Sequence, residues 1–168
     1  LDRLQTQLSA RGFAHVMEEE APICAMRLGA LRVDFMPDDA SVLGFTNRWY
    51  TDALQTATPC ALPTGEVIRL VTPPLFVATK LEAYKGRGNN DPLGSRDIED
   101  ILTLVDGRPS LLDELRGASA ALRQYVADEL AQLLVLHSFA YAVTSAAGND
   151  PGREALIFEH LDAMKALA

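Results

Sequence analysis

The residue pattern of this chain changes at Thr72, and this change constrains the fold more than any other feature. Before Thr72, short runs of alternating apolar and polar residues are typical of strands. After it, Pro73-Pro74 begins a long stretch of helical periodicity, because threonine caps helices and proline fits their first turn. The sequence therefore predicts an α+β protein. Residues 1–72 would form a small mixed or antiparallel sheet with flanking helices, and residues 73–168 a helical bundle.

One predicted β-hairpin has a loop that fixes the register of its strands. Gly29-Ala30 is a two-residue loop with glycine first, as a type II′ turn prefers. This loop places Arg27 directly opposite Arg32 and puts both on the same face as Asp34. Two arginines across a ladder repel each other unless acidic groups or an anion lie nearby. The face is therefore either a solvated surface neutralised by the acidic residues 18–20 or the site of an anion.

The remaining predicted elements follow from caps, glycines and prolines. They are a helix over 47–57 capped by Thr46, short strands over 58–62 and 67–71, helices over 73–85 and 96–105, and three helical stretches after residue 110. Breaks are expected near Gly117 and at 148–151. The stretch 122–136 is strongly apolar, as a buried bundle helix is.

Asp34 is a candidate functional residue because strands disfavour aspartate. From a strand, its carboxylate can act as a metal ligand or as a base toward a hydroxyl. The alternative is an edge-strand aspartate that pairs with Arg27 or Arg32.

Lys80 is a second candidate, because it lies in the middle of a predicted helix among apolar residues. Helical spacing places it on one stripe with Phe76, Tyr84 and Arg87. A lysine in this position either extends its ammonium to water or aims it at an anion in a cleft.

Asp97 and Asp100 lie early in their predicted helix, where the helix dipole is a sufficient structural reason for negative charge. At about 100° per residue, Asp97 lies at the edge of the apolar stripe that contains Ile98 and Ile101, and Asp100 lies farther from it. Asp97 is therefore the better candidate for a cleft, and we expect Asp100 to be solvated.

The other chemistry-bearing residues give weak signals. Cys24 and Cys60 lie in apolar strand-like stretches without metal-ligand spacing, which favours buried free thiols over a disulfide. The three histidines have no partners at metal or triad spacing, so we expect structural or surface roles. The sequence contains no nucleophile elbow, phosphate-binding P-loop or dinucleotide glycine fingerprint.

The amino-acid composition limits the classes of partner, such as nucleic acid or membrane, that the chain can be expected to bind. The chain carries 15 basic and 23 acidic residues, a net charge of −8, which argues against a broad basic surface that coats nucleic acid. No apolar run approaches the roughly 18 residues needed to span a bilayer. From the sequence we expect a cytoplasmic protein without a membrane partner.

Four segments together resemble the nucleotidyltransferase family, and within it the AbiEii/AbiGii toxin-like group. The resemblance covers roughly residues 1–105. Its segments are Leu31-Arg32-Val33-Asp34-Phe35-Met36-Pro37, Val42-Leu43-Gly44-Phe45-Thr46-Asn47-Arg48-Trp49-Tyr50, the Lys80 helix and Arg96-Asp97-Ile98-Glu99-Asp100.

The resemblance implies a site for a nucleoside triphosphate and Mg²⁺. In this family a Gly-Ser pair precedes an Asp-x-Asp strand, whose aspartates and a third on a later strand hold two Mg²⁺ ions. Asp34 matches the third aspartate, a catalytic residue and metal ligand. Lys80 matches the lysine expected to contact nucleotide phosphates, and Asp97 and Arg32 join it as expected nucleotide-binding residues.

The sequence departs from the family in one respect: it contains no Asp-x-Asp, and its only Gly-Ser, Gly94-Ser95, opens a later helix. The missing motif would be expected just before Leu1. Either the chain is a fragment of an enzyme that transfers NMP to a hydroxyl on RNA, protein or a small molecule, or the protein has lost the motif and works by binding. A binding module would pair with an antitoxin-like partner, or with itself through an exposed sheet edge. A third alternative is a structural helical domain in which Asp34 and Lys80 form only surface pairs.

Overall fold

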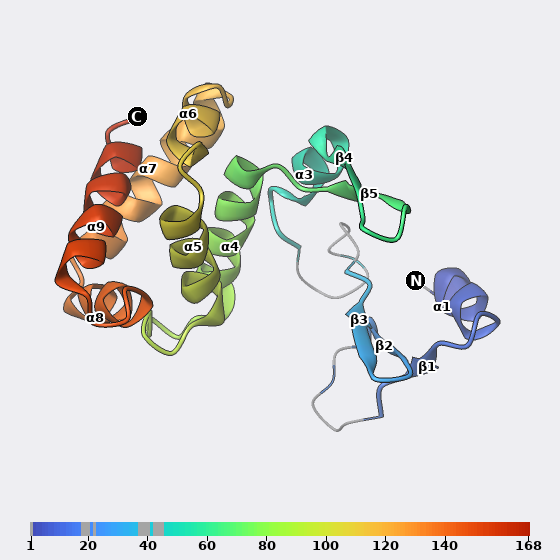
Figure 1. Ribbon diagram of the computed structural model, residues 1–168. Coiled ribbons are helices and arrows are strands. Elements are labelled where there is room, and N and C mark those ends of the chain that lie inside the picture. Colours follow the sequence, from blue (N-terminus) through green and yellow to red (C-terminus); the bar gives the residue numbers. More distant parts are fainter. Residues whose placement is uncertain (1, 18–20, 22, 37–40, 42–45) are drawn as a thin grey trace. The chain divides into compact units, whose positions relative to one another are not determined.

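The computed structural model describes residues 2–17, 21, 23–36, 41 and 46–168. The chain separates into two compact units, the N-terminal unit Leu1–Thr46 and the helical unit Asn47–Ala168 (Figure 1). The expected boundary between residues 72 and 73 lies inside the helical unit. The described residues hold both helices and antiparallel sheets, which confirms the α+β class.

The N-terminal unit contains a three-stranded antiparallel sheet in the order β1-β2-β3. Its elements are α1 (Asp2–Ser9), β1 (Ala14–His15), β2 (Ala25–Leu28) and β3 (Leu31–Asp34). The predicted hairpin register is confirmed: Arg27 pairs with Arg32, and Ala25 with Asp34. Gly29 has a φ of 58°, a left-handed conformation that a glycine adopts without strain.

The N-terminal unit has a small core beneath β2. Cys24, Ala25 and Met26 are buried in it, and the rings of Phe13 and Phe35 meet edge to face at 5.9 Å. Both cysteines are free, as predicted, although Cys60 is only partly buried. The acidic residues 18–20 and the segment 42–45, on which parts of the prediction depend, lie outside the described residues.

The helical unit begins with one short helix and a β-hairpin. These are α3 (Tyr50–Thr56), β4 (Thr58–Ala61) and β5 (Val67–Leu70). The predicted Thr46 cap is wrong, because the Asn47 side chain organises this turn. Its Oδ1 accepts a hydrogen bond from the Trp49 N–H at 3.1 Å, and its Nδ2 donates to the Thr79 carbonyl at 2.7 Å. The helix then begins at Tyr50.

Six further helices complete the unit: α4 (Pro73–Arg87), α5 (Arg96–Gly107), α6 (Leu111–Arg116), α7 (Ala120–Leu134), α8 (His137–Ala146) and α9 (Pro151–Lys165). The single helical stretch predicted between the breaks at Gly117 and 148–151 is wrong, because the structure divides it into α7 and α8. The chain bends by 100° between α7 and α8, and this bend lets Phe139 and Val143 pack into the core. In the described residues no single helix is long and apolar enough to cross a membrane.

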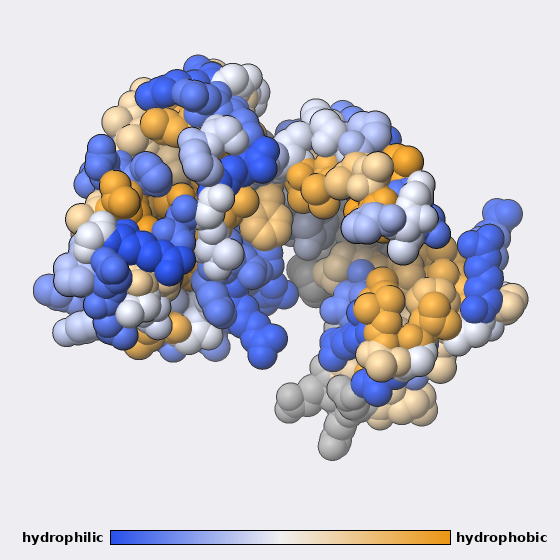
Figure 2. All heavy atoms as spheres, in the orientation of Figure 1, coloured by the Kyte–Doolittle hydropathy of each residue, from blue (hydrophilic) through white to orange (hydrophobic). Residues whose placement is uncertain are grey.

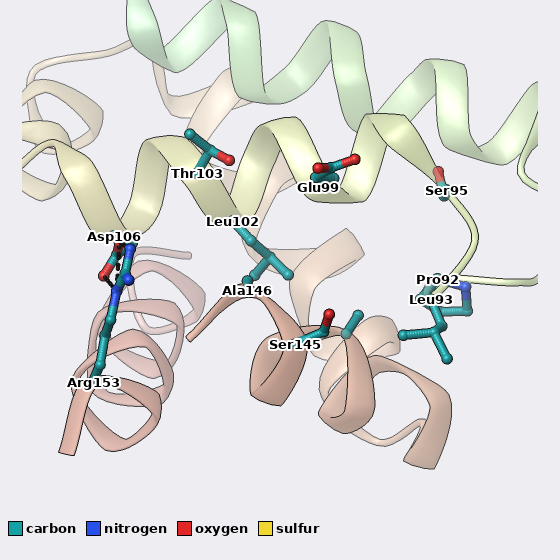
Figure 3. A pocket seen from close by; sticks show the side chains of 11 residues that line it. Pro92, Leu93, Ser95, Glu99, Leu102, Thr103, Asp106, Ser145, Ala146 and Arg153 are labelled. Carbon is teal, nitrogen blue, oxygen red and sulfur yellow. Dashed lines mark hydrogen bonds and ion pairs between the residues drawn. The ribbon is translucent and has the colours of Figure 1, made fainter. Parts of the chain in front are cut away.

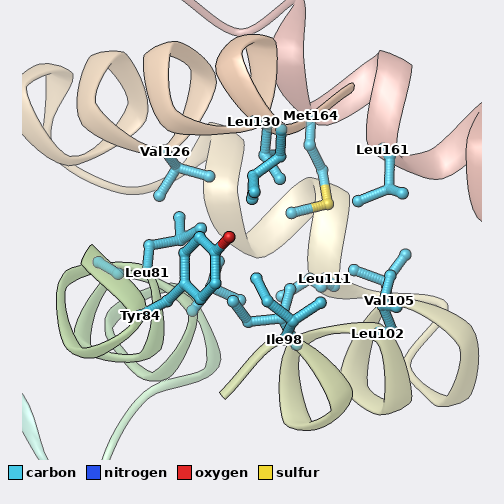
Figure 4. Packing of buried hydrophobic residues seen from close by; sticks show 14 of the residues in the cluster. Leu81, Tyr84, Ile98, Leu102, Val105, Leu111, Val126, Leu130, Leu161 and Met164 are labelled. Carbon is cyan, nitrogen blue, oxygen red and sulfur yellow. The ribbon is translucent and has the colours of Figure 1, made fainter. Parts of the chain in front are cut away.

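Side chains from all seven helices of the helical unit, α3 to α9, contribute to its hydrophobic core, part of which is drawn in Figure 4. Helix α5 packs against α4, α8 and α9, and its Ile98, Ile101 and Leu102 are at most 1% exposed. Other buried residues of the core include Leu81 of α4, Leu130 of α7 and Leu161 of α9. This core fixes α4 against α5 and therefore sets the distances between the polar side chains at their common edge.

The β4–β5 hairpin differs from the helices in its surface. Its apolar side chains are exposed, including Val67 (66%), Ile68 (40%) and Leu70 (48%). Figure 2 shows these hydrophobic residues gathered over the hairpin. Arg69 fastens the hairpin to α3 by donating to the carbonyl oxygens of Gln55 and Ala57.

Candidate functional site

A cluster of four charged side chains lies where α4 packs against α5. Lys80 and Arg87 are seven residues apart on α4, which is two helical turns, so they share one face. Asp97 and Asp100 are three residues apart on α5 and also share a face. Ser95 begins α5 by accepting a hydrogen bond from the Ile98 N–H at 3.4 Å, which places Asp97 in the first turn. We call these four residues the α4–α5 charge cluster.

Asp97 lies at the centre of the cluster and is only 3% exposed. The Arg87 guanidinium binds it in a bidentate manner: Nε donates to Oδ2 at 2.9 Å, and Nη2 donates to Oδ1 at 2.8 Å. The Lys80 ammonium donates to the same Oδ1 at 3.3 Å. A buried carboxylate needs such partners, because an unpaired buried charge is strongly unfavourable. Helical spacing predicted Asp97 at the edge of the buried face, and the structure places it nearer the core than Asp100.

Lys80 connects the two aspartates. Besides Asp97, it contacts Asp100 Oδ2 at 2.5 Å, and its ammonium lies 5.5 Å from the centre of the Phe76 ring. The Lys80 side chain is 24% exposed and that of Asp100 is 46% exposed. Asp100 is thus partly solvated, as predicted, but helical spacing did not predict its contact with Lys80.

The contacts in the cluster shift the pKa values of Asp97, Lys80 and Arg87 toward the charged forms. Burial by itself raises the pKa of Asp97, but the hydrogen bonds and positive charges of Arg87 and Lys80 outweigh it and lower that pKa below its ordinary value. Burial by itself lowers the pKa of Lys80, but the Asp100 and Asp97 carboxylates outweigh it and raise that pKa. All three residues therefore carry full charges at neutral pH.

The cluster borders a polar hollow of about 390 Å³ at the α4–α5 connection. Arg87 and Asp97 line it together with Asn89, Ser95 and Arg96, among others. The Arg87 side chain is 70% exposed, so its guanidinium holds Asp97 while remaining open to solvent. A ligand in this hollow would meet the solvent-facing side of Arg87.

Asp34 and Arg32, the other predicted site residues, lie in the N-terminal unit. The structure pairs them with each other: Arg32 Nε donates to Asp34 Oδ1 at 3.2 Å, and both side chains are about two-fifths exposed. This is the ion pair expected if Asp34 were a structural edge-strand residue. Burial raises the pKa of the neighbouring Cys24 thiol, with a contribution from the Asp34 charge, so this cysteine stays protonated.

The structure brings Lys80 to Asp97 and Arg32 to Asp34. Sequence reasoning placed Arg87 on the Lys80 stripe but missed its bidentate contact with Asp97. The available signal was the pairing of an arginine at the end of one helix with an aspartate at the start of the next, across a short glycine- and asparagine-rich loop.

Two other hollows lack the predicted residues. One of about 400 Å³ lies between α5, α8 and α9, where Arg153 and Asp106 pair with each other at one end (Figure 3). The other, of about 770 Å³, is lined by apolar residues such as Leu75 and Leu122 and by Trp49. The Trp49 Nε1 has no hydrogen-bond partner among the described atoms, but it is buried and is not reached from this hollow.

The described residues do not fit the Mg²⁺ site that the resemblance implies. Among them, no group of three or more His, Cys, Asp or Glu side chains is arranged to hold a metal ion. Mg²⁺ requires several oxygen ligands in an octahedral arrangement, whereas Asp34 contributes a single carboxylate that is paired with Arg32. We therefore assign no metal-dependent step to these residues.

Comparisons with known proteins bear on the chain as a whole. It matches no profile of a known protein family, and no curated protein or solved structure matches it. The candidate site is therefore defined by its own geometry.

Proposed function

We propose that this protein is nucleotidyltransferase-like and that the α4–α5 charge cluster binds the phosphates of a nucleoside triphosphate. The observation that supports the proposal is that Lys80 and Arg87 both donate hydrogen bonds to the buried Asp97. Both cations meet at the same Asp97 Oδ1, and one of them, Arg87, lines the polar hollow at the α4–α5 connection.

The two cations are suited to phosphate for different reasons. The Arg87 guanidinium is planar and uses only two of its five N–H donors on Asp97, so others can reach a ligand. The Lys80 ammonium is a compact charge that meets phosphate oxygens from any direction. Both carboxylate oxygens of Asp97 accept hydrogen bonds from the two cations, so Asp97 acts as a positioning residue that restricts both of them.

The proposal extends to the reaction that the resemblance implies, transfer of NMP from an NTP to a hydroxyl acceptor. Asp34 would then take part in that chemistry, together with Arg32 on the same strand. Transfer would also require carboxylates arranged to hold Mg²⁺, and the described residues contain no such group. Phosphate binding is therefore the part of the proposal that the described residues support directly.

A titration with each of the four NTPs tests the binding site. We expect Lys80→Gln to weaken binding about tenfold or more, because a charge-assisted hydrogen bond contributes roughly 1.5–3 kcal/mol. Lys85→Gln is the matched control: Lys85 lies on the same helix, pairs with Glu129 at 2.7 Å and is about half exposed. Equal affinities for wild type and Lys80→Gln would contradict the proposal.

The second candidate function is that of a binding module without catalytic activity. The exposed β4–β5 hairpin favours this function. A two-stranded hairpin is marginally stable alone, so its exposed apolar side chains would be stabilised by a second copy or another protein. Sedimentation at high micromolar concentration tests self-association, with Val67→Lys expected to weaken it. A monomer at all concentrations would exclude the self-associating form of this candidate.

A further inference from the structure

We propose that Asp100 is an internal competitor for the Lys80 ammonium and that a phosphate ligand binds by displacing it. This inference rests on the proposed function, since it concerns how the same cluster accepts its ligand. It assigns to Asp100 a role distinct from that of Asp97, although both contact the same ammonium.

The two aspartates hold Lys80 in different ways. Asp100 makes the shorter contact, at 2.5 Å against 3.3 Å for Asp97, yet its side chain is 46% exposed while that of Asp97 is 5% exposed. Asp97 is also bound by two Arg87 donors. Asp100 can therefore rotate into solvent at a small free-energy cost, because exposed ion pairs are weak. Breaking the contacts of Asp97 costs more, because it would leave a buried charge unpaired.

The charges of the cluster show why such a displacement is needed. Lys80 and Arg87 carry two positive charges, and Asp97 and Asp100 carry two negative charges, so the four side chains sum to zero. With Asp100 in place, the cluster has little net attraction for an anion. When Asp100 turns away, the three remaining side chains carry one net positive charge beside the Arg87 hollow.

The replacement of Asp100 by a ligand on Lys80 favours some classes of anion over others. A monocarboxylate that replaces Asp100 on Lys80 brings no more charge than it removes, so it gains nothing electrostatically. A phosphate group or phosphate chain brings at least as much charge and several acceptor oxygens that reach both Lys80 and Arg87. The cluster should therefore accept polyphosphates and reject simple carboxylates.

Tripolyphosphate is a suitable probe because it presents the phosphate chain without a base. We expect Asp100→Asn to bind it about two- to fivefold more tightly than wild type at low ionic strength, the range that corresponds to loss of one exposed ion pair. Glu99→Gln is the matched control, because it removes the same charge one residue away on an exposed part of α5 that lines a different hollow. The affinity of Glu99→Gln for tripolyphosphate should change by less than about half as much as that of Asp100→Asn. Added salt should reduce both changes in affinity.

A second readout follows Lys80 without any ligand. The rate at which an acylating reagent modifies the Lys80 amine, mapped by mass spectrometry, should rise in Asp100→Asn, because the carboxylate no longer holds the ammonium. Glu99→Gln should leave that rate unchanged. Tighter tripolyphosphate binding with faster acylation supports the displacement.

The outcomes separate this inference from the proposed function. If Lys80→Gln loses NTP binding while Asp100→Asn binds tripolyphosphate no better than wild type, the displacement is wrong and the phosphate site stands. If neither wild type nor Asp100→Asn binds tripolyphosphate or any NTP, both are wrong.

Discussion

Asp97 is a buried carboxylate whose charge is balanced by two cations from the neighbouring helix. Three donor contacts, two from Arg87 and one from Lys80, satisfy its oxygens in a position that is 3% exposed. Because the same contacts fix Arg87 and Lys80, one residue serves both the α4–α5 interface and the proposed phosphate site. A stability measurement and a binding measurement should therefore both respond to it.

Replacing Asp97 should destabilise the fold. We expect Asp97→Asn to lower the free energy of unfolding by about 1–3 kcal/mol, since it removes the negative charge and leaves an amide among donors. Urea denaturation at neutral pH measures this loss, and Asp162→Asn, which removes an exposed i,i+3 ion pair with Lys165, is the control. Equal losses of unfolding free energy in the two variants would contradict the claim that Asp97 stabilises the α4–α5 interface.

The contribution of Asp97 should also depend on pH in a defined direction. Its pKa is lowered in the folded state, so its stabilisation is complete above the ordinary aspartate pKa of about 3.9 and is lost as the pH falls through the lower folded value. The stability difference between wild type and Asp97→Asn should therefore shrink between about pH 5 and pH 2. A difference that is constant or grows on acidification would show that the charge of Asp97 is not the cause.

At the level of elements, the end of α4 depends on a glycine that has no room for a side chain. A Cβ on Gly88 would lie 2.2 Å from the Tyr84 ring, whereas a Cβ on Gly86 would meet nothing within 4 Å. Tyr84 is buried in the core and cannot move away freely. The position of the α4–α5 connection, and with it Arg87, is therefore tied to this contact.

Two alanine substitutions test this dependence and should act in opposite directions. Gly88→Ala should destabilise the protein by about 1–3 kcal/mol through overpacking. Gly86→Ala, in the exposed last turns of the helix, should stabilise it by about 0.5–1 kcal/mol. Thermal and urea unfolding measure both, and a neutral Gly88→Ala would show that the loop relaxes without cost.

The elements that the sequence predicted correctly are those determined by nearby residues. The β2–β3 register follows from the two-residue loop at Gly29, and the start of α5 follows from Ser95. The errors arise where distant packing decides. The α7–α8 bend has no glycine or proline to mark it, and it exists because Phe139 packs into the core.

The candidate site shows the same limit. Helix periodicity could place Lys80 and Arg87 on one stripe and Asp97 at the edge of a buried face. It could not show that these residues meet, because Asp97 is 10 residues from Arg87 and 17 from Lys80 along the chain. Only the packing of α4 on α5 brings them together.

At the scale of the protein, the described core of the helical unit consists of residues from that unit. Every residue of the described core cluster lies between Trp49 and Met164. We therefore expect a fragment of residues 47–168 to fold alone, with a helical circular dichroism spectrum and a cooperative thermal transition. A fragment without that transition would show that residues 1–46 are required for the helical core.

A ¹H–¹⁵N titration of the protein with a non-hydrolysable nucleoside triphosphate would locate the phosphate site residue by residue. If the α4–α5 charge cluster binds phosphate, the largest shifts should fall on the last turns of α4, the connecting loop and the first turns of α5, and Lys80→Gln should need about tenfold more ligand to reach them. Shifts centred on the hollow around Trp49 and Leu122, or no shifts with any of the four bases, would contradict it.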